Sequence, residues 1–115
     1  MRSGSLAEAQ AARLAVMRIS AEQQQIIVDA VHQLFGQQGR VRLFGSRVDD
    51  RRKGGDLDLL VELPHLPVDA PWQAARLEAR LQQLLGEQKI DVILAGPENA
   101  SWPIVQEAAR TGIPL

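Results

Sequence analysis

The stretch at residues 43–63, LFGSRVDDRRKGGDLDLLVEL, decides the fold of this chain. Its two apolar ends predict two strands joined by a charged loop. The first strand is expected at residues 40–44, where polar and apolar side chains alternate, and the second at residues 57–63. Asp56 and Asp58 stand at the head of the second strand, directly after two glycines. The feature to be explained is why an apolar strand begins with two carboxylates.

The composition is that of one soluble globular domain. The chain has 115 residues and a formal net charge of −1, so no strong overall field attracts nucleic acid or an anionic membrane, and direct nucleic-acid binding is not expected. The absence of cysteine excludes disulfides, thiol nucleophiles and thiolate metal sites. No segment approaches the roughly 20 apolar residues that span a bilayer. The N-terminus lacks the uninterrupted apolar region of a signal peptide, so a cytoplasmic location is expected.

The domain is expected to occupy residues 17–115. Ser20 and Gln23 have the spacing of a capping box, which predicts the start of a helix. Residues 1–16 precede this signal and begin with MRSGS. We expect this N-terminal extension to be left by cloning or disordered, without a function of its own.

Three helices and a third strand follow from the apolar spacing. The first helix is expected to end near Gly36, and the second to begin near Pro71 and end at Gly86. A strand is expected at residues 89–95, and Ser101 is expected to cap a last helix. The positions expected to face the core are Ile27, Val31, Leu34 and Phe35, then Ala74, Leu77, Leu81 and Leu84, then Ile104, Val105, Ala108 and Ala109. This order predicts an α/β (α+β) domain, a small mixed sheet flanked by helices.

The aromatic residues are few. Trp72 and Trp102 each stand at the start of an expected helix and are expected to be packing anchors, with Trp102 also a candidate for an interface. His32 and His65 are isolated from other candidate ligands and are expected to be structural or solvated.

Asp56 and Asp58 point to the same face of a strand, because side chains two residues apart do so. At about 6–7 Å and an effective dielectric of about 20, their repulsion is on the order of 2–3 kcal/mol. Aspartate is also a poor strand residue. A bound cation would remove the repulsion, and carboxylate oxygens are the ligands that Mg²⁺ prefers. The alternative is that Asp56 is a turn residue and Asp58 is solvated.

Two further features favour a metal and phosphate site. Asp91 is a lone carboxylate within an apolar strand, and it joins the same face if that strand pairs beside the second one. Gly45 lets a ligand approach the backbone closely, and Ser46 offers a hydroxyl and an N–H to a phosphate. The alternative for this pair is an ordinary turn with a helix cap. Basic residues are concentrated nearby, at Arg40, Arg42, Arg47, Arg51, Arg52 and Lys53.

The set resembles the DNA polymerase β-like nucleotidyltransferases. Gly45 and Ser46 are followed after nine residues by Asp56-x-Asp58, and Asp91 lies on a later strand. The short chain is similar to the minimal nucleotidyltransferase (MNT) domains, the antitoxins of HEPN/MNT toxin–antitoxin pairs. The resemblance covers residues 20–115.

The resemblance implies a chemistry for these residues. Asp56, Asp58 and Asp91 would hold two Mg²⁺ ions, and Gly45, Ser46 and Arg47 would bind the phosphates of ATP or another NTP. A nucleoside monophosphate would be transferred to a hydroxyl group, and the expected one is AMP from ATP.

The family also implies a partner. The acceptor in MNT pairs is typically a tyrosine of a HEPN toxin, and this chain has no tyrosine, so a tyrosine acceptor must belong to another protein. A homo- or hetero-oligomer is compatible with this role. Two alternatives stay open: transfer to a hydroxyl of a small molecule, and a non-catalytic antitoxin that acts by binding alone.

Overall fold

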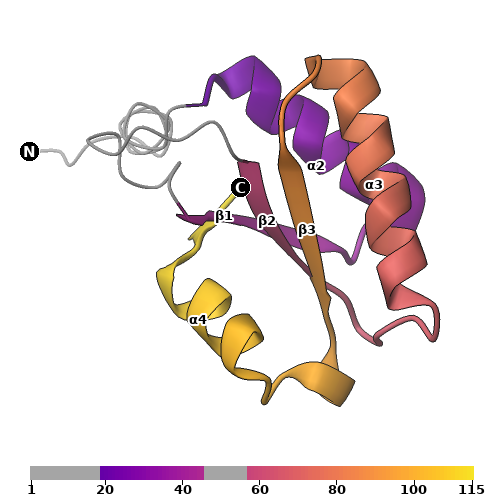
Figure 1. Cartoon of the computed structure of the whole chain (residues 1–115), viewed down its shortest axis with the longest axis vertical. Coiled ribbons are helices and arrows are strands. Elements are labelled where there is room, and N and C mark those ends of the chain that lie inside the picture. The colour runs from indigo at the N-terminus through magenta and orange to yellow at the C-terminus, as the bar shows by residue number, and fades with distance from the viewer. Residues whose placement is uncertain (1–18, 46–56) are drawn as a thin grey trace, which may run out of the picture.

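The computed structural model of the protein describes residues 19–45 and 57–115. Within these residues four strands form one mixed sheet, with helices on both of its faces (Figure 1). The elements are α2 (Ala21–Phe35), β1 (Arg40–Phe44), β2 (Leu57–Glu62), α3 (Ala70–Leu85), β3 (Ile90–Ala95), the 3-10 turn η2 (Pro97–Asn99), α4 (Pro103–Thr111) and β4 (Ile113–Pro114). The expected α+β class and mixed sheet are confirmed.

The sheet order is β3-β2-β1-β4. β1 is antiparallel to β2 and to β4, whereas β2 and β3 are parallel. The parallel pair needs a crossover connection, and α3 supplies it. β4 was not predicted, because a two-residue strand leaves no periodic pattern and its Pro114 is tolerated only at a sheet edge.

The two faces of the sheet are covered unequally. α2 and α3 cover one face, where Leu57, Leu59 and Val61 of β2 are buried in the main core. α4 covers part of the opposite face (Figure 1), where Leu60 is buried in a smaller cluster with Ala95, Val105 and Ala108. β2 therefore contributes to two cores, and its even-numbered residues belong to the α4 side.

The first helix begins and ends where the sequence predicts. The Ser20 hydroxyl accepts the Gln23 backbone N–H at 3.0 Å, and the Gln23 side chain accepts the Ser20 N–H at 2.9 Å, so the capping box is present. Gly36 follows the last turn with φ 94°. Gly86 ends α3 in the same way.

The last helix differs from the expectation at its start. Trp102 is the N-cap and Pro103 the first helical residue, so Ser101 does not cap the helix. Ile104 is 51% exposed instead of inward, because the helix packs through Val105 and Ala108 and the residue before Val105 is turned by about 100°. In α3, Leu84 is 42% exposed, whereas Ala74, Leu77 and Leu81 are buried.

Neither tryptophan is a packing anchor. Trp72 is 65% exposed at the start of α3, and Trp102 is 55% exposed before α4. Both indole rings are therefore available at the surface. Each helix in the described part of the chain is too short or too polar to cross a bilayer.

Candidate functional site

Asp58 and Asp91 lie opposite each other on neighbouring strands. They are register partners in the parallel pairing of β2 with β3, which sets their backbones about 4.8 Å apart with side chains on one face. Asp91 was expected to share a face with Asp58 only if its strand paired beside β2, and this pairing is present. Asp58 is half-buried and Asp91 is exposed. Asp58 shares its face with Leu60, two residues on, so the pair lies on the α4 side of the sheet.

Gly45 places its backbone against the Asp58 carboxylate. Phe44, the last residue of β1, is the register partner of Asp58. Gly45 follows with φ 78°, and a Cβ added there would come within 2.1 Å of Asp58 Oδ2. The sequence suggested that this glycine leaves room for a ligand. The structure adds a second requirement, because the carboxylate itself occupies the space that a side chain would need.

Three of the expected site residues lie outside the described residues: Ser46, Arg47 and Asp56. The same holds for the extension at residues 1–16. Among residues 19–45 and 57–115, no three His, Cys, Asp or Glu side chains form a group that could hold a metal ion. Asp58 and Asp91 supply two of the three expected carboxylates, and their hard oxygen donors fit Mg²⁺.

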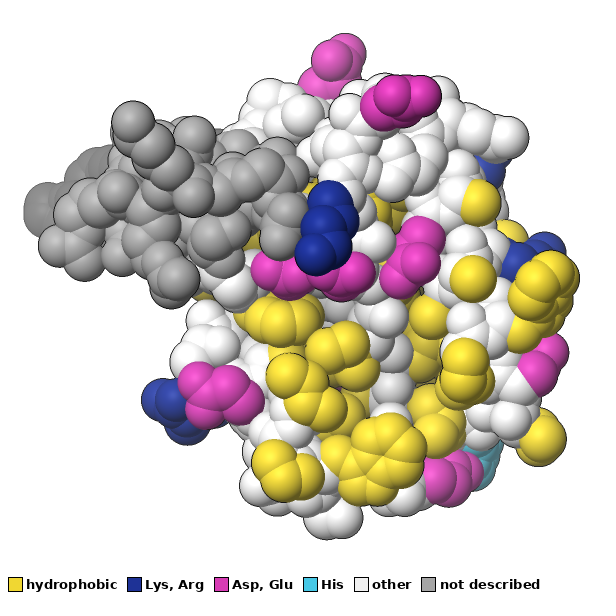
Figure 2. Space-filling model, viewed as in Figure 1, with side chains coloured by type: hydrophobic (Ala, Val, Ile, Leu, Met, Phe, Trp, Pro, Cys, Tyr) yellow, Lys and Arg dark blue, Asp and Glu magenta, His cyan; other side chains and the backbone are white. Residues whose placement is uncertain are grey.

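An apolar surface adjoins the acidic pair. Figure 2 shows acidic side chains near the centre of the molecular face in view and a broad area of hydrophobic side chains below them. Phe44 and Ile93 are partly buried against the smaller core, and Trp102 and Ile104 of the α4 segment are exposed. Any molecule that reaches Asp58 and Asp91 from this side also meets apolar side chains.

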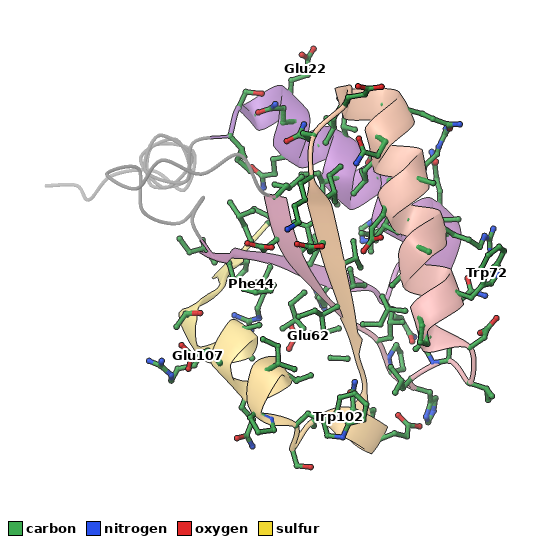
Figure 3. All side chains as sticks on the ribbon, viewed as in Figure 1. Glu22, Phe44, Glu62, Trp72, Trp102 and Glu107 are labelled. Atoms are coloured by element: carbon green, nitrogen blue, oxygen red, sulfur yellow. The ribbon has the colours of Figure 1, made fainter. Side chains whose placement is uncertain are left out.

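Sequence reasoning did not assign a role to Glu62. Arg42 Nε donates to Glu62 Oε1 at 2.9 Å, and both side chains are about one third exposed, at 31% and 37%. Arg42 is the register partner of Leu60, so the ion pair is also on the α4 side. Figure 3 shows Glu62 between the sheet and α4. The sequence signal that could have revealed it is spacing. Glu62 lies four residues after Asp58 along β2, so the two side chains point to the same face.

A hollow of about 380 Å³ lies between the sheet and α4. Its walls come from the ends of β2 and β3, the turn after β3, and one side of α4. The residues that line it are Glu62, Leu63, Ala95, Gly96, Ala100, Val105, Gln106 and Ala109. A larger cavity of about 440 Å³ lies at the outer edge of β1, near His32, Arg40 and Leu115. Glu62 lines both cavities and neither aspartate lines either of them, but the hollow under α4 lies on the face of the sheet that carries Asp58 and Asp91.

The outer edge of β3 is partly closed by side chains. β2 uses Lys89 O and Ala95 O as acceptors, so Val92 and Leu94 direct their backbone groups outward. Glu78 Oε2 accepts the Val92 N–H at 2.9 Å, and Asn99 Nδ2 donates to Leu94 O at 3.0 Å. Such caps discourage strand addition. The sheet face, instead of this edge, is therefore the open side of the site.

Comparison with protein-family models gives no match for this chain, and comparison with curated proteins gives none either. The geometry of the described residues therefore carries the functional inference.

Proposed function

We propose that this chain is a metal-dependent nucleotidyltransferase of the polymerase β-like fold, an MNT antitoxin that transfers AMP from ATP to a hydroxyl of a HEPN-type toxin. The observation that carries the proposal is the in-register pair Asp58 and Asp91 on the open face of β2 and β3. A second observation supports it, since the Gly45 backbone lies directly against the Asp58 carboxylate. The order of strands and the crossover helix are compatible with the proposed fold.

The proposed roles follow from exposure and position. Asp58, together with Asp56, would hold the metal that carries the triphosphate. Asp91, the more exposed of the described pair, would face the acceptor hydroxyl. Bound Mg²⁺ would neutralise the carboxylates and the charge that develops on the phosphate oxygens. Gly45, Ser46 and Arg47 would bind the phosphates, with Arg47 adding charge.

The bond changes are those of a single displacement. The acceptor oxygen forms a bond to the α-phosphorus. At the same time the bond breaks between the α-phosphorus and the oxygen that joins it to the β-phosphorus. Pyrophosphate leaves, and the proton of the hydroxyl passes to a carboxylate or to water. A partner protein supplies the acceptor in the main proposal, and a small-molecule alcohol supplies it in the alternative.

Binding is tested without catalysis. Mg²⁺ with a non-hydrolysable ATP analogue is expected to raise the melting temperature, because ligand at a hundredfold excess over Kd adds about 2.7 kcal/mol of stability. Asp58→Asn and Asp91→Asn are expected to lose this shift while remaining folded. Asp29→Asn is the control, since Asp29 is exposed on α2 and bonded to Gln25. No shift in the wild type at millimolar ligand contradicts a nucleotide site.

Transfer is tested with α-labelled ATP, Mg²⁺ and the candidate toxin. Label on the toxin and loss of its toxicity are expected, and Asp91→Asn is expected to bind the toxin without labelling it. If the Asp58→Asn/Asp91→Asn double variant neutralises the toxin as well as the wild type does, the chain acts by binding alone. Label on a small alcohol, and none on the toxin, would favour the second alternative.

A further inference from the structure

The hollow between the sheet and α4 begins farther along the two strands that carry the acidic pair, Asp58 and Asp91. Glu62 and Ala95 line the hollow, and each stands four residues after an aspartate of the pair. At about 3.3 Å per residue, the hollow begins about 13 Å from the pair. We propose that the hollow binds the purine base of the nucleotide whose phosphates are held at the pair, adenine when the nucleotide is ATP. This base site rests on the proposed function, which supplies the nucleotide.

The surface between the acidic pair and the hollow is apolar. Leu60 of β2 is buried there and Ile93 of β3 is partly buried, both in the cluster under α4. Each lies two residues beyond an aspartate of the pair, so its side chain points to the same face. Carboxylates, an apolar strip and a hollow therefore follow one another along the strands. A nucleotide bound through a metal has its groups in the same order, because the ribose joins the phosphates to a flat base with largely apolar faces.

The walls of the hollow consist mainly of small side chains. Its volume of about 380 Å³ lies within the range of small-molecule sites, about 300–1,000 Å³. Alanine and glycine project little into the hollow, which leaves room for a rigid, flat ring. The apolar lining residues are Leu63, Ala95, Gly96, Ala100, Val105 and Ala109. Burial of the faces of a purine against these walls is favourable.

The charge beside the hollow is already balanced. Glu62 accepts from Arg42 at 2.9 Å, so this carboxylate has its counter-charge on the neighbouring strand. The other described residues that line the hollow are uncharged. A neutral group therefore enters the hollow without a new counter-charge, and a nucleobase is neutral near pH 7 whereas a free cation or anion is not.

Gln106 is the polar side chain that α4 contributes to the hollow. It is exposed and lines the hollow, and within the described part of the chain its side-chain amide has no hydrogen-bond partner. An amide offers a donor and an acceptor side by side. Glutamine pairs in this way with the amino group and a ring nitrogen of adenine. We therefore assign to Gln106 the contact with the edge of the base.

The base site is tested with adenosine in the absence of metal. Adenosine at millimolar concentration is expected to change the backbone amide shifts of Ala95, Val105 and Ala109 saturably, whereas ribose alone is not. Equal effects of ribose, no saturable change, or changes at Val28 and His32 of the other cavity overturn the proposal. Neither nucleoside nor ribose carries a phosphate, so this outcome does not depend on a metal at the acidic pair. Adenosine binding without any effect of Mg²⁺ and the ATP analogue on the melting temperature would contradict the nucleotidyltransferase alone.

The role of Gln106 is tested by a change of base preference. Gln106→Glu replaces a donor and an acceptor by two acceptors, which match the two neighbouring donors on the edge of guanine. The ratio of guanosine affinity to adenosine affinity is expected to rise about tenfold, or about 1.4 kcal/mol, within the range for one bidentate contact. Gln83→Glu is the control, because Gln83 is exposed on α3, which covers the opposite face of the sheet. An unchanged ratio in Gln106→Glu, or an equal change in Gln83→Glu, overturns the proposal.

The link between the base site and the acidic pair is tested with Mg²⁺ and non-hydrolysable ATP and GTP analogues. Gln106→Glu is expected to move the preference toward the GTP analogue, in the same direction as for the nucleosides. If the nucleoside preference changes and the nucleotide preference does not, the hollow does not hold the base of the bound nucleotide and the proposal fails. The proposed function survives that result, because nucleotide binding at the pair is measured in the same experiment.

Discussion

The Asp58 carboxylate occupies the space that a side chain at position 45 would need. This contact joins two motifs that are separated in the sequence, the end of β1 and the start of β2. The glycine is required twice, by its φ of 78° and by the close approach of the carboxylate. Any larger residue at position 45 must shift the Asp58 carboxylate.

Gly45→Ala is therefore expected to be more harmful than Gly86→Ala. Gly86 also has a positive φ, 93°, but a Cβ there meets nothing within 4 Å. Each substitution costs about 1–3 kcal/mol of backbone strain, and only Gly45→Ala adds the clash with Asp58. We expect Gly45→Ala to lower the denaturation midpoint further and to weaken binding of Mg²⁺ with the ATP analogue. Equal effects of the two variants on nucleotide binding would contradict the proposed coupling between Gly45 and Asp58.

At the scale of elements, the turn after β3 is tied to the loop after β2. Glu98 of η2 accepts the Leu66 backbone N–H at 2.8 Å and lies 3.6 Å from His65. The hydrogen bond from Leu66 lowers the pKa of Glu98 from its ordinary value of 4.5, with a smaller contribution from His65. Because this turn leads from β3 to α4, the contact fixes one wall of the hollow.

A lowered pKa in the folded state means that the Glu98 contact contributes fully above pH 4.5. Its contribution is lost as the pH falls through the folded-state pKa. We expect the melting temperature of Glu98→Gln to lie below that of the wild type above this pH, with the gap closing as the pH is lowered. Glu87→Gln, an exposed residue after α3, should show no gap. A gap that persists undiminished to strongly acidic pH would show that the charge of Glu98 is not involved.

At the scale of the whole molecule, one sheet supports two cores of different size. The α2 and α3 side buries most of the large apolar residues, whereas Leu60 is the one fully buried large side chain in the cluster under α4, within the described residues. Regions with few buried apolar contacts open at lower free energy. We therefore expect α4 to open at a lower free energy than α2 and α3.

Leu60→Ala is expected to loosen α4 selectively. Removal of a buried leucine typically costs about 2–5 kcal/mol. We expect amide hydrogen exchange in α4 to accelerate much more than exchange in α2 and α3. Leu77→Ala, in the main core, is the matched substitution and should accelerate exchange throughout the sheet and its helices. Uniform acceleration in Leu60→Ala would contradict the division into two cores.

Much of the candidate site was visible in the sequence. Gly45 was selected because glycine lets a ligand approach the backbone closely, and Asp58 because it pairs with Asp56 at the head of an apolar strand. Asp91 was selected because it is a lone carboxylate within such a strand. The face of Asp91 depended on a strand pairing that periodicity does not encode, and the structure provides it. Glu62 was overlooked, because a single carboxylate at the end of a strand is usual in a solvated strand. Its position in the hollow depends on where α4 lies.

The sequence by itself determined most of the local elements, but not β4 or the start of α4. The Ser20 capping box, the glycines after α2 and α3, and the alternation in β1 act through neighbouring residues, so they are legible without a structure. The tertiary structure alone decided the register of Asp58 with Asp91, the burial of Leu60 and the exposure of Ile104. Each of these depends on contacts between segments far apart in the chain. Because β2 contributes to both cores, no simple alternation along it reveals the burial of Leu60.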